Sequence, residues 1–166
     1  WVMAHPEATL TSEQQKQLGD SIARLENGEA FPYVLGHWEF FGLELDITPD
    51  VLIPRPETET LITVAKAYLA SQKEAGTIVD VCTGSGCIGL ALKTLFPEWH
   101  VVLSDISDAA LHIAHKNAQR LNLDVEIICG DLLEPFFGRG ADCIVANPPY
   151  LSTSEWMELD SSVKRY

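Results

Sequence analysis

The segment TIVDVCTGSGCIGLAL, residues 77 to 92, decides the fold class of this chain. It starts as an apolar strand, passes through a glycine-rich turn, and continues with the apolar spacing of a helix. Gly84, Gly86 and Gly89 form a G-x-G-x-x-G pattern, in which glycine lets the backbone turn tightly and approach a ligand. This order predicts an α/β fold that binds a nucleotide-like cofactor where its strands end.

The same alternation of strand and helix continues toward the C-terminus. Four strands are expected, at residues 78–81, 101–105, 125–129 and 141–146. Ser107 is expected to cap the helix between the second and third strands. Because the strands are apolar at nearly every position, we expect a parallel sheet covered on both faces.

A different pattern precedes residue 77. Thr11 or Ser12 begins a helix with a capping box, and Gly28 suits its end. Alternating apolar residues on both sides of Gly42 predict a β-hairpin. Pro56 is expected to open a second helix, which ends before residue 76.

The composition excludes several classes of protein. Of the 166 residues, 24 are acidic and 11 basic, so the net charge of −13 disfavours direct contact with nucleic acid. No apolar run approaches the roughly 20 residues of a membrane span. The four cysteines lack CxxC spacing and are expected to be reduced core thiols of a cytoplasmic protein. His112 and His115 are expected to be solvated helix positions, so we expect no metal site.

Three carboxylates accompany the first three predicted strands. Asp80 lies near the end of the first, Asp105 ends the second, and Asp131 follows the third. Asp105 could accept hydrogen bonds from ribose hydroxyls, and Asp131 could bind an adenine edge. Several acids at one sheet edge favour a cationic cofactor, S-adenosylmethionine, over a dinucleotide. The alternative is that the glycines serve close packing and the acids cap helices.

The fourth strand ends in an unusual motif, Asn147-Pro148-Pro149-Tyr150. The Asn147 amide oxygen and the Pro148 carbonyl could accept two hydrogen bonds from an incoming NH2 group, and proline presets that carbonyl. Tyr150 could stack on a planar group. The motif therefore suits a carboxamide or an exocyclic base amine, whose nitrogen is held in line with a methyl donor and needs no strong general base. A strand simply terminated by proline is the alternative.

Together these residues resemble a known family. DVCTGSGCIGLAL, Asp105, Asp131 and NPPY resemble the class I S-adenosylmethionine-dependent methyltransferases that act on NH2 groups. With VLIPRPETE (51–59) and YVLGHWEFFGLEL before it, the chain resembles the peptide-chain release factor N5-glutamine methyltransferases. That resemblance implies a Rossmann-like fold, S-adenosylmethionine as cofactor, and methylation of the glutamine of a Gly-Gly-Gln motif in a release factor, a protein of translation termination.

The resemblance also implies roles for residues. A cofactor-binding set would hold the methionine part, the ribose and the adenine: Cys82, Thr83, Gly84, Ser85, Gly86, Asp105, Asp131, Leu132 and Asn147. Asn147, Pro148, Pro149 and Tyr150 would hold the glutamine, and Asn147, Pro148 and Tyr150 would be catalytic. Residues 55–57 would line the edge of the cofactor pocket.

The family's organisation implies three parts in this chain. Residues 1–35 would belong to an N-terminal helical domain for substrate recognition, 36–55 would be a hairpin linker, and 56–166 would be the methyltransferase domain. Four strands instead of seven predict a fragment, incomplete at its C-terminus, poorly active and prone to pair through an exposed strand edge.

Cys82 departs from the family pattern, because many members have glycine there. A related group that methylates a ribosomal-protein glutamine has cysteine, so that substrate stays an alternative. An adenine-N6 methyltransferase for nucleic acid is a second alternative, which the acidic charge disfavours. A binding module without catalysis is a third.

Overall fold

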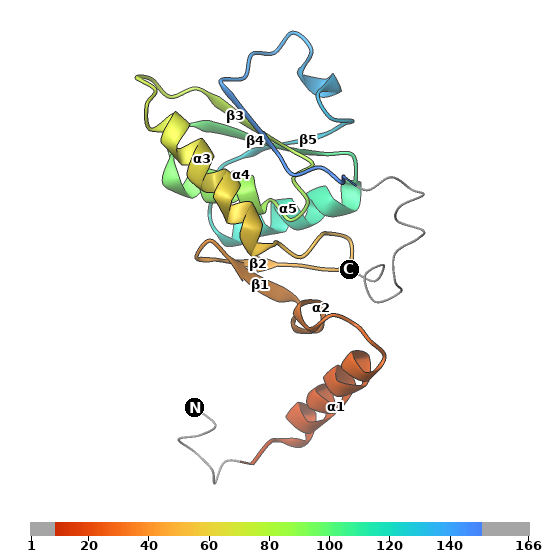
Figure 1. Ribbon diagram of the computed structural model, residues 1–166. Helices are drawn as coiled ribbons and strands as arrows, with labels where there is room; N and C mark the ends of the chain where they lie inside the picture. The colour runs from red at the N-terminus through yellow and green to blue at the C-terminus, as the bar shows by residue number, and fades with distance from the viewer. Residues whose placement is uncertain (1–8, 151–166) are drawn as a thin grey trace.

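A computed structural model describes residues 9 to 150 of the chain. It contains a four-stranded parallel sheet, a two-stranded antiparallel hairpin, and helices that precede and connect them (Figure 1). In chain order the elements are α1 (Ser12–Glu26), α2 (Phe31–Leu35), β1 (His37–Phe40), β2 (Leu43–Asp46), the 3₁₀ helix η2 (Pro56–Thr58), α3 (Glu59–Leu69), β3 (Thr77–Val81), α4 (Cys87–Leu95), β4 (His100–Asp105), α5 (Asp108–Arg120), β5 (Glu126–Cys129), the 3₁₀ helix η3 (Glu134–Phe136) and β6 (Cys143–Ala146).

The parallel sheet has the strand order β5-β4-β3-β6. Helices α4 and α5 carry the chain from β3 to β4 and then to β5, each strand lying beside the one before it. The chain then returns past β3, so that β6 pairs with the opposite side of that strand. The direction of the strand order therefore changes between β3 and β6, and in open α/β sheets ligands bind outside the carboxyl ends of the strands at such a point.

Among the described residues, α-helices cover one face of this sheet. Ile78, Val101 and Leu103 point to α3, α4 and α5, and form one buried core with Ile62 of α3 and Ala114 of α5. On the other face, Val79, Val81 and Val102 pack with Ile128 and with Phe136 of the 3₁₀ helix η3, and no α-helix of residues 9–150 covers them. Ile144 on β6 is half exposed. The sheet was expected to be covered on both faces. In the described residues, α-helices cover one face only.

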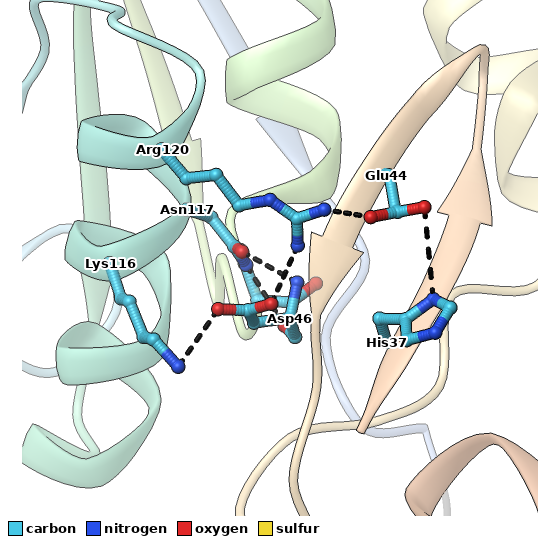
Figure 2. Close-up of polar contacts among 7 residues, drawn as sticks. His37, Glu44, Asp46, Lys116, Asn117 and Arg120 are labelled. Carbon is cyan, nitrogen blue, oxygen red and sulfur yellow. Dashed lines mark hydrogen bonds and ion pairs between the residues drawn. The ribbon is translucent and has the colours of Figure 1, made fainter. Parts of the chain in front are cut away.

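The hairpin packs against the helix-covered side of the fold. Phe40 and Leu45 are buried in the same core as α3 and α4, and Gly42 makes the turn between β1 and β2 with a φ of 76°. Asp46 ends β2 and forms ion pairs with Lys116 (2.9 Å) and Arg120 (2.6 Å) of α5 (Figure 2). These contacts anchor the predicted hairpin to α5, and so to the half of the chain that contains the parallel sheet.

The predicted elements before β3 are largely confirmed. Thr11 caps α1, and it shares a reciprocal capping box with Gln14. Later in the chain, Ser107 caps α5 in the same way, as its side chain accepts from the Ala110 amide. Pro56 opens the 3₁₀ turn η2, which leads directly into α3. The short α2 was not predicted, because five residues give too little periodicity to detect a helix.

All four predicted parallel strands exist, with shifted beginnings. β5 begins at Glu126 and β6 at Cys143, which are one and two residues later than expected. β5 and β6 are the two edge strands of the described sheet. Between residues 9 and 150, no helix has both the length and the apolar character needed to cross a membrane.

Candidate active site

The glycine loop and the Asn-Pro-Pro-Tyr motif begin side by side. Val81 of β3 is the parallel partner of Ala146 of β6, so Cys82 and Asn147 leave two hydrogen-bonded strands at the same level. Neighbouring strands lie about 5 Å apart. Val81 is also paired with Ser104, which brings Asp105 to the same edge of the sheet. The strand register therefore gathers the glycine loop, Asp105 and Asn147 at the point where the strand order changes direction.

The loop after β3 has a conformation that its glycines make possible. Cys82 and Gly84 both have positive φ, 56° in each case, and the Thr83 amide donates to the Ser104 carbonyl over 3.0 Å. Cys82 is not glycine, and left-handed backbone at such residues is uncommon and costs free energy. Gly89 serves packing instead, because a Cβ there would lie 2.2 Å from Leu103 Cδ2. The loop thus turns sharply and passes directly into α4.

The buried Asp80 side chain holds the loop by hydrogen bonds from inside the fold. It lies inside β3, is fully buried, and its Oδ2 accepts from Thr83 Oγ1 (2.6 Å) and from the Gly89 amide (2.9 Å). Its Oδ1 has no hydrogen-bond partner within residues 9–150. Burial raises the pKa of this carboxyl to about 6 against the effect of its two hydrogen bonds. Asp80 thus lies near the end of β3, as expected, but its carboxylate is bonded to Thr83 and Gly89 inside the fold.

Asp105 is the carboxylate that joins the loop to the next helix. One oxygen accepts from the Gly84 amide (2.9 Å) and the other from the Ser107 amide (3.0 Å). Asp105 is half-buried at the end of β4. The two amides fix the orientation of the Asp105 carboxylate. Because each carboxylate oxygen can accept more than one hydrogen bond, Asp105 can still accept hydrogen bonds from the hydroxyl groups of a ligand.

Asp131 and Leu132 lie at the end of the third parallel strand. The Gly130 amide donates to the Asp105 carbonyl (3.0 Å), which continues the β4–β5 pairing and brings Asp131 near the loop. Both residues are exposed, and Leu132 has a positive φ of 46°. Burial raises the pKa of the Cys82 thiol, and the negative charges of Asp105, Asp80 and Asp131 raise it further. All three carboxylates are therefore close enough to Cys82 to act on the pKa of its thiol.

The side chains of the loop divide into buried and accessible ones. Thr83 and Ser85 are buried, so the loop can present only their backbone groups to a ligand. Cys82 and Gly84 are partly exposed, and Gly86 is buried. Of the five loop residues expected to hold the cofactor, Cys82 and Gly84 are the accessible ones.

The amide of Asn147 is oriented by a residue that the sequence analysis missed. Asn147 Nδ2 donates to Thr58 Oγ1 over 3.4 Å. Thr58 belongs to the PRPETE stretch, one residue beyond the segment 55–57 that was expected at the pocket edge. Arg55 and Glu57 themselves are exposed. Pro148, Pro149 and Tyr150 are exposed as well, and Tyr150 keeps 86% of its surface accessible. The aromatic ring is therefore accessible to a planar group.

The other cysteines and two of the histidines of the described residues differ in exposure. Cys87 is buried and its pKa is raised to about 12, chiefly by burial, so it stays a thiol. The expectation of four core thiols is wrong for Cys129, which is exposed, and for Cys82 and Cys143, which are partly exposed. His112 and His115 are solvent-exposed on α5, as expected. No cluster of three metal-ligating side chains occurs in the described part of the chain.

A hollow of about 390 Å³ lies away from the glycine loop. Its lining comes from the end of α1, from α2 and from the segment after the hairpin, and includes Arg24, Glu29, Tyr33 and Pro49. This hollow is therefore separate from the candidate site, whose residues are brought together by strand register and hydrogen bonds.

The sequence matches a family model and many curated proteins. Residues 58–160 match the model described as methyltransferase small domain. A release factor glutamine methyltransferase of Chlamydia trachomatis serovar L2 is 44% identical over 95% of this chain and 54% of its own length. One of Koribacter versatilis is 43% identical over the whole chain and 59% of its own length. The chain thus spans little more than half the length of these relatives, and the resemblance to their family is confirmed.

Solved structures share the fold. The human methyltransferase 10 domain containing protein matches with a TM-score of 0.56 and 26% identity, over 75% of this chain and 62% of its own. The N-terminal domain of human METTL16 in complex with SAH matches with a TM-score of 0.55 and 23% identity, over 68% of this chain and 49% of its own. These matches confirm the expected Rossmann-like methyltransferase fold.

Proposed function

The chain belongs to the methyltransferase small domain family, and from this premise we propose that it binds S-adenosylmethionine and methylates the side-chain amide nitrogen of a glutamine. The observation that carries the proposal is the pairing of Val81 with Ala146, which sets the glycine loop beside Asn147. A cofactor and an acceptor amide held on those two segments would meet at the carboxyl ends of β3 and β6.

The residues at this edge fit S-adenosylmethionine. Asp105 is held by two backbone amides and keeps acceptor capacity for the ribose hydroxyls. Asp131 and Leu132 are exposed beside it and would border the adenine. Cys82 to Gly86 would hold the methionine part, chiefly through backbone groups. The negative charge around Cys82 suits a cofactor that carries a sulfonium and an amino group.

The proposed mechanism relies on positioning. When bound, S-adenosylmethionine supplies an electrophilic methyl group. Asn147 Oδ1 and the Pro148 carbonyl would each accept a hydrogen bond from one N–H of the glutamine amide, and Tyr150 would stack on its plane. Pro149 would help to fix the direction of the chain. These contacts would hold the weakly nucleophilic nitrogen toward the methyl group and would stabilise the positive charge that develops on it. The nitrogen exchanges one of its two protons for the methyl group, and that proton would pass to solvent water.

The proposed protein substrate is a peptide-chain release factor, through the glutamine of its Gly-Gly-Gln motif. The names of the curated relatives and the joint presence of PRPETE and NPPY support this choice. We assign residues 1–35 to recognition of that protein, 36–55 to a linker, and 56–166 to methyl transfer. Such a substrate implies a cytoplasmic location, and the acidic charge favours a protein over a nucleic acid as partner.

A methyl-transfer assay with labelled S-adenosylmethionine tests the proposal. We expect label on a purified release factor and none on the same protein with its motif glutamine replaced by alanine. Label on an adenine-containing oligonucleotide, or on a ribosomal protein but not on the release factor, would overturn the substrate assignment. Binding of S-adenosylhomocysteine without transfer to any of these would indicate a binding module instead.

A further inference from the structure

Asn117 is a fully buried polar residue on the face of α5 that is otherwise apolar. Its side chain reaches two segments that are far away in the sequence. Oδ1 accepts from the Asp46 amide (2.7 Å), while Nδ2 donates to the Asp46 carbonyl (3.0 Å) and to the Ser85 carbonyl (2.9 Å). Figure 2 shows this amide between α5 and the end of the hairpin. Asn117 is therefore bonded both to β2 and to the glycine loop.

The bond to Ser85 acts on a peptide unit at the centre of the loop. The Ser85 carbonyl and the Gly86 amide belong to the same planar group. Its N–H donates to the Thr83 carbonyl (2.9 Å), and its C=O accepts from Asn117. The orientation of this peptide is thus fixed at both ends, between two glycines that both have positive φ. Loss of the Asn117 bond would leave this peptide held at its N–H alone, next to a glycine whose backbone rotates easily.

Asparagine is the residue that can make all three bonds. Its amide offers two N–H donors and one acceptor oxygen in a plane. Aspartate has a similar shape but no donor, and glutamine would displace the amide by one methylene group. The ion pairs between hairpin and α5 differ, because Lys116 and Arg120 are exposed and their contacts with Asp46 and Glu44 do not reach the loop.

We propose that Asn117 is a positioning residue that couples docking of the hairpin to the conformation of the cofactor loop. Each of the two segments then favours the ordered state of the other, because one buried amide needs both to satisfy its hydrogen bonds. Coupling of this kind is reciprocal, so binding of the cofactor stabilises the hairpin contact by the same factor by which the hairpin contact strengthens cofactor binding. The inference rests on the proposed role of the glycine loop in cofactor binding.

The first test uses the native chain, so it does not depend on a variant that folds. Amide hydrogen exchange is measured by NMR with and without S-adenosylhomocysteine. The Asp46 amide donates to Asn117, and its exchange is expected to slow by about 5-fold or more when the ligand binds. The Gly42 amide at the hairpin tip, which donates to Glu39 instead, is the control and is expected to stay unchanged. An unchanged Asp46 rate under saturating ligand would overturn the coupling.

The second test compares two ways of weakening the hairpin contact. Asn117→Asp removes both donors but keeps the acceptor, whereas Lys116→Ala with Arg120→Ala removes only the ion pairs. Calorimetry at a temperature where both proteins are folded is expected to show S-adenosylhomocysteine affinity lowered by about 5-fold or more in the first variant. The second should lie within about 2-fold of native, because exposed ion pairs contribute little.

The outcomes separate this inference from the proposed function. Equal affinity in the native chain and in Asn117→Asp would overturn the coupling alone. If the native chain does not bind S-adenosylhomocysteine, the proposed function fails and the inference fails with it.

Discussion

Asn147 Nδ2 donates to Thr58 Oγ1 over 3.4 Å, across 89 residues of sequence. The contact joins the two most distinctive motifs of the chain, PRPETE and NPPY. It occupies an N–H of the Asn147 amide, and it leaves the oxygen with acceptor capacity. Thr58 would therefore hold the amide with its oxygen available to the NH2 group of the proposed substrate.

Replacement of Thr58 by valine tests this orientation. Thr58→Val keeps the branched shape and removes the hydroxyl, so kcat is expected to fall by about 2- to 10-fold, the effect of one ordinary hydrogen bond. Thr58→Ser retains the hydroxyl and should stay near the native rate. Steady-state kinetics at saturating cofactor measure both variants. Equal rates for Thr58→Val and the native chain would show that the contact does not orient Asn147.

Removal of the Asn147 side chain is expected to affect the chemical step. Asn147→Ala should lower kcat by about 100- to 1,000-fold, the usual loss for a group that stabilises developing charge. The affinity for S-adenosylhomocysteine should change far less, because the proposed contact is with the acceptor amide. Single-turnover kinetics and calorimetry give the two quantities. Equal losses in both would contradict the role of Asn147 in holding the substrate.

Asp105 is expected to act on cofactor binding. Asp105→Ala removes the acceptor for the ribose and the tie to the Gly84 amide, and it should weaken S-adenosylhomocysteine binding by about 1–3 kcal/mol. Asp124→Ala, an exposed acid in the turn before β5, is the matched control for lost negative charge. Calorimetry measures the affinity of both variants for S-adenosylhomocysteine. An unchanged affinity in Asp105→Ala would show that Asp105 is not part of the cofactor site.

Asp80 gives the protein a defined dependence on pH. Its folded pKa of about 6 lies above the ordinary value of 3.8, so folding favours the protonated form. The stability from that preference is complete below pH 4 and is lost as the pH rises through 6. Asp80→Asn lacks the titration. Its free energy of unfolding, relative to native, should therefore increase by roughly 2–3 kcal/mol between pH 4 and pH 7.

Urea unfolding of both proteins at the two pH values measures this difference. The subtraction removes the contributions of all other groups that titrate alike in the two proteins. A difference that stays constant with pH would show that Asp80 is not held in a raised-pKa state.

The order of the helices and strands, and the parallel direction of the strands, could be predicted from the sequence. Nearly continuous apolar runs mark β3 to β6, because strands in a parallel sheet lose both faces to packing. Glycine at positions of positive φ, and Thr11 and Ser107 at helix starts, mark turns and caps through their own local chemistry. These signals act within a few residues, and this is why the fold class and the position of NPPY were predicted correctly.

The support beneath the site depends on contacts between distant segments, which local patterns do not report. Asn117 meets Asp46 across 71 residues, and Thr58 meets Asn147 across 89. One signal was available for Asn117, because it is a polar residue on the apolar side of α5. The burial of Asp80 also follows from alternation, since it points to the same side of β3 as Ile78.

The pairing of β3 with β6 has a consequence for how the protein gains and loses activity. From β3 to β5 the chain adds neighbours in sequence order, but β6 must close a long loop, as the bond from the Thr77 amide to Asp142 Oδ2 spans 65 residues. Non-local pairings of this kind form late in folding. We therefore expect β6 to be the last strand to dock and the first to detach on heating. A molecule in which β6 has detached would retain Asp105 and the glycine loop, and could still bind the methyl donor. It would no longer hold Asn147, and therefore the acceptor amide, beside that donor.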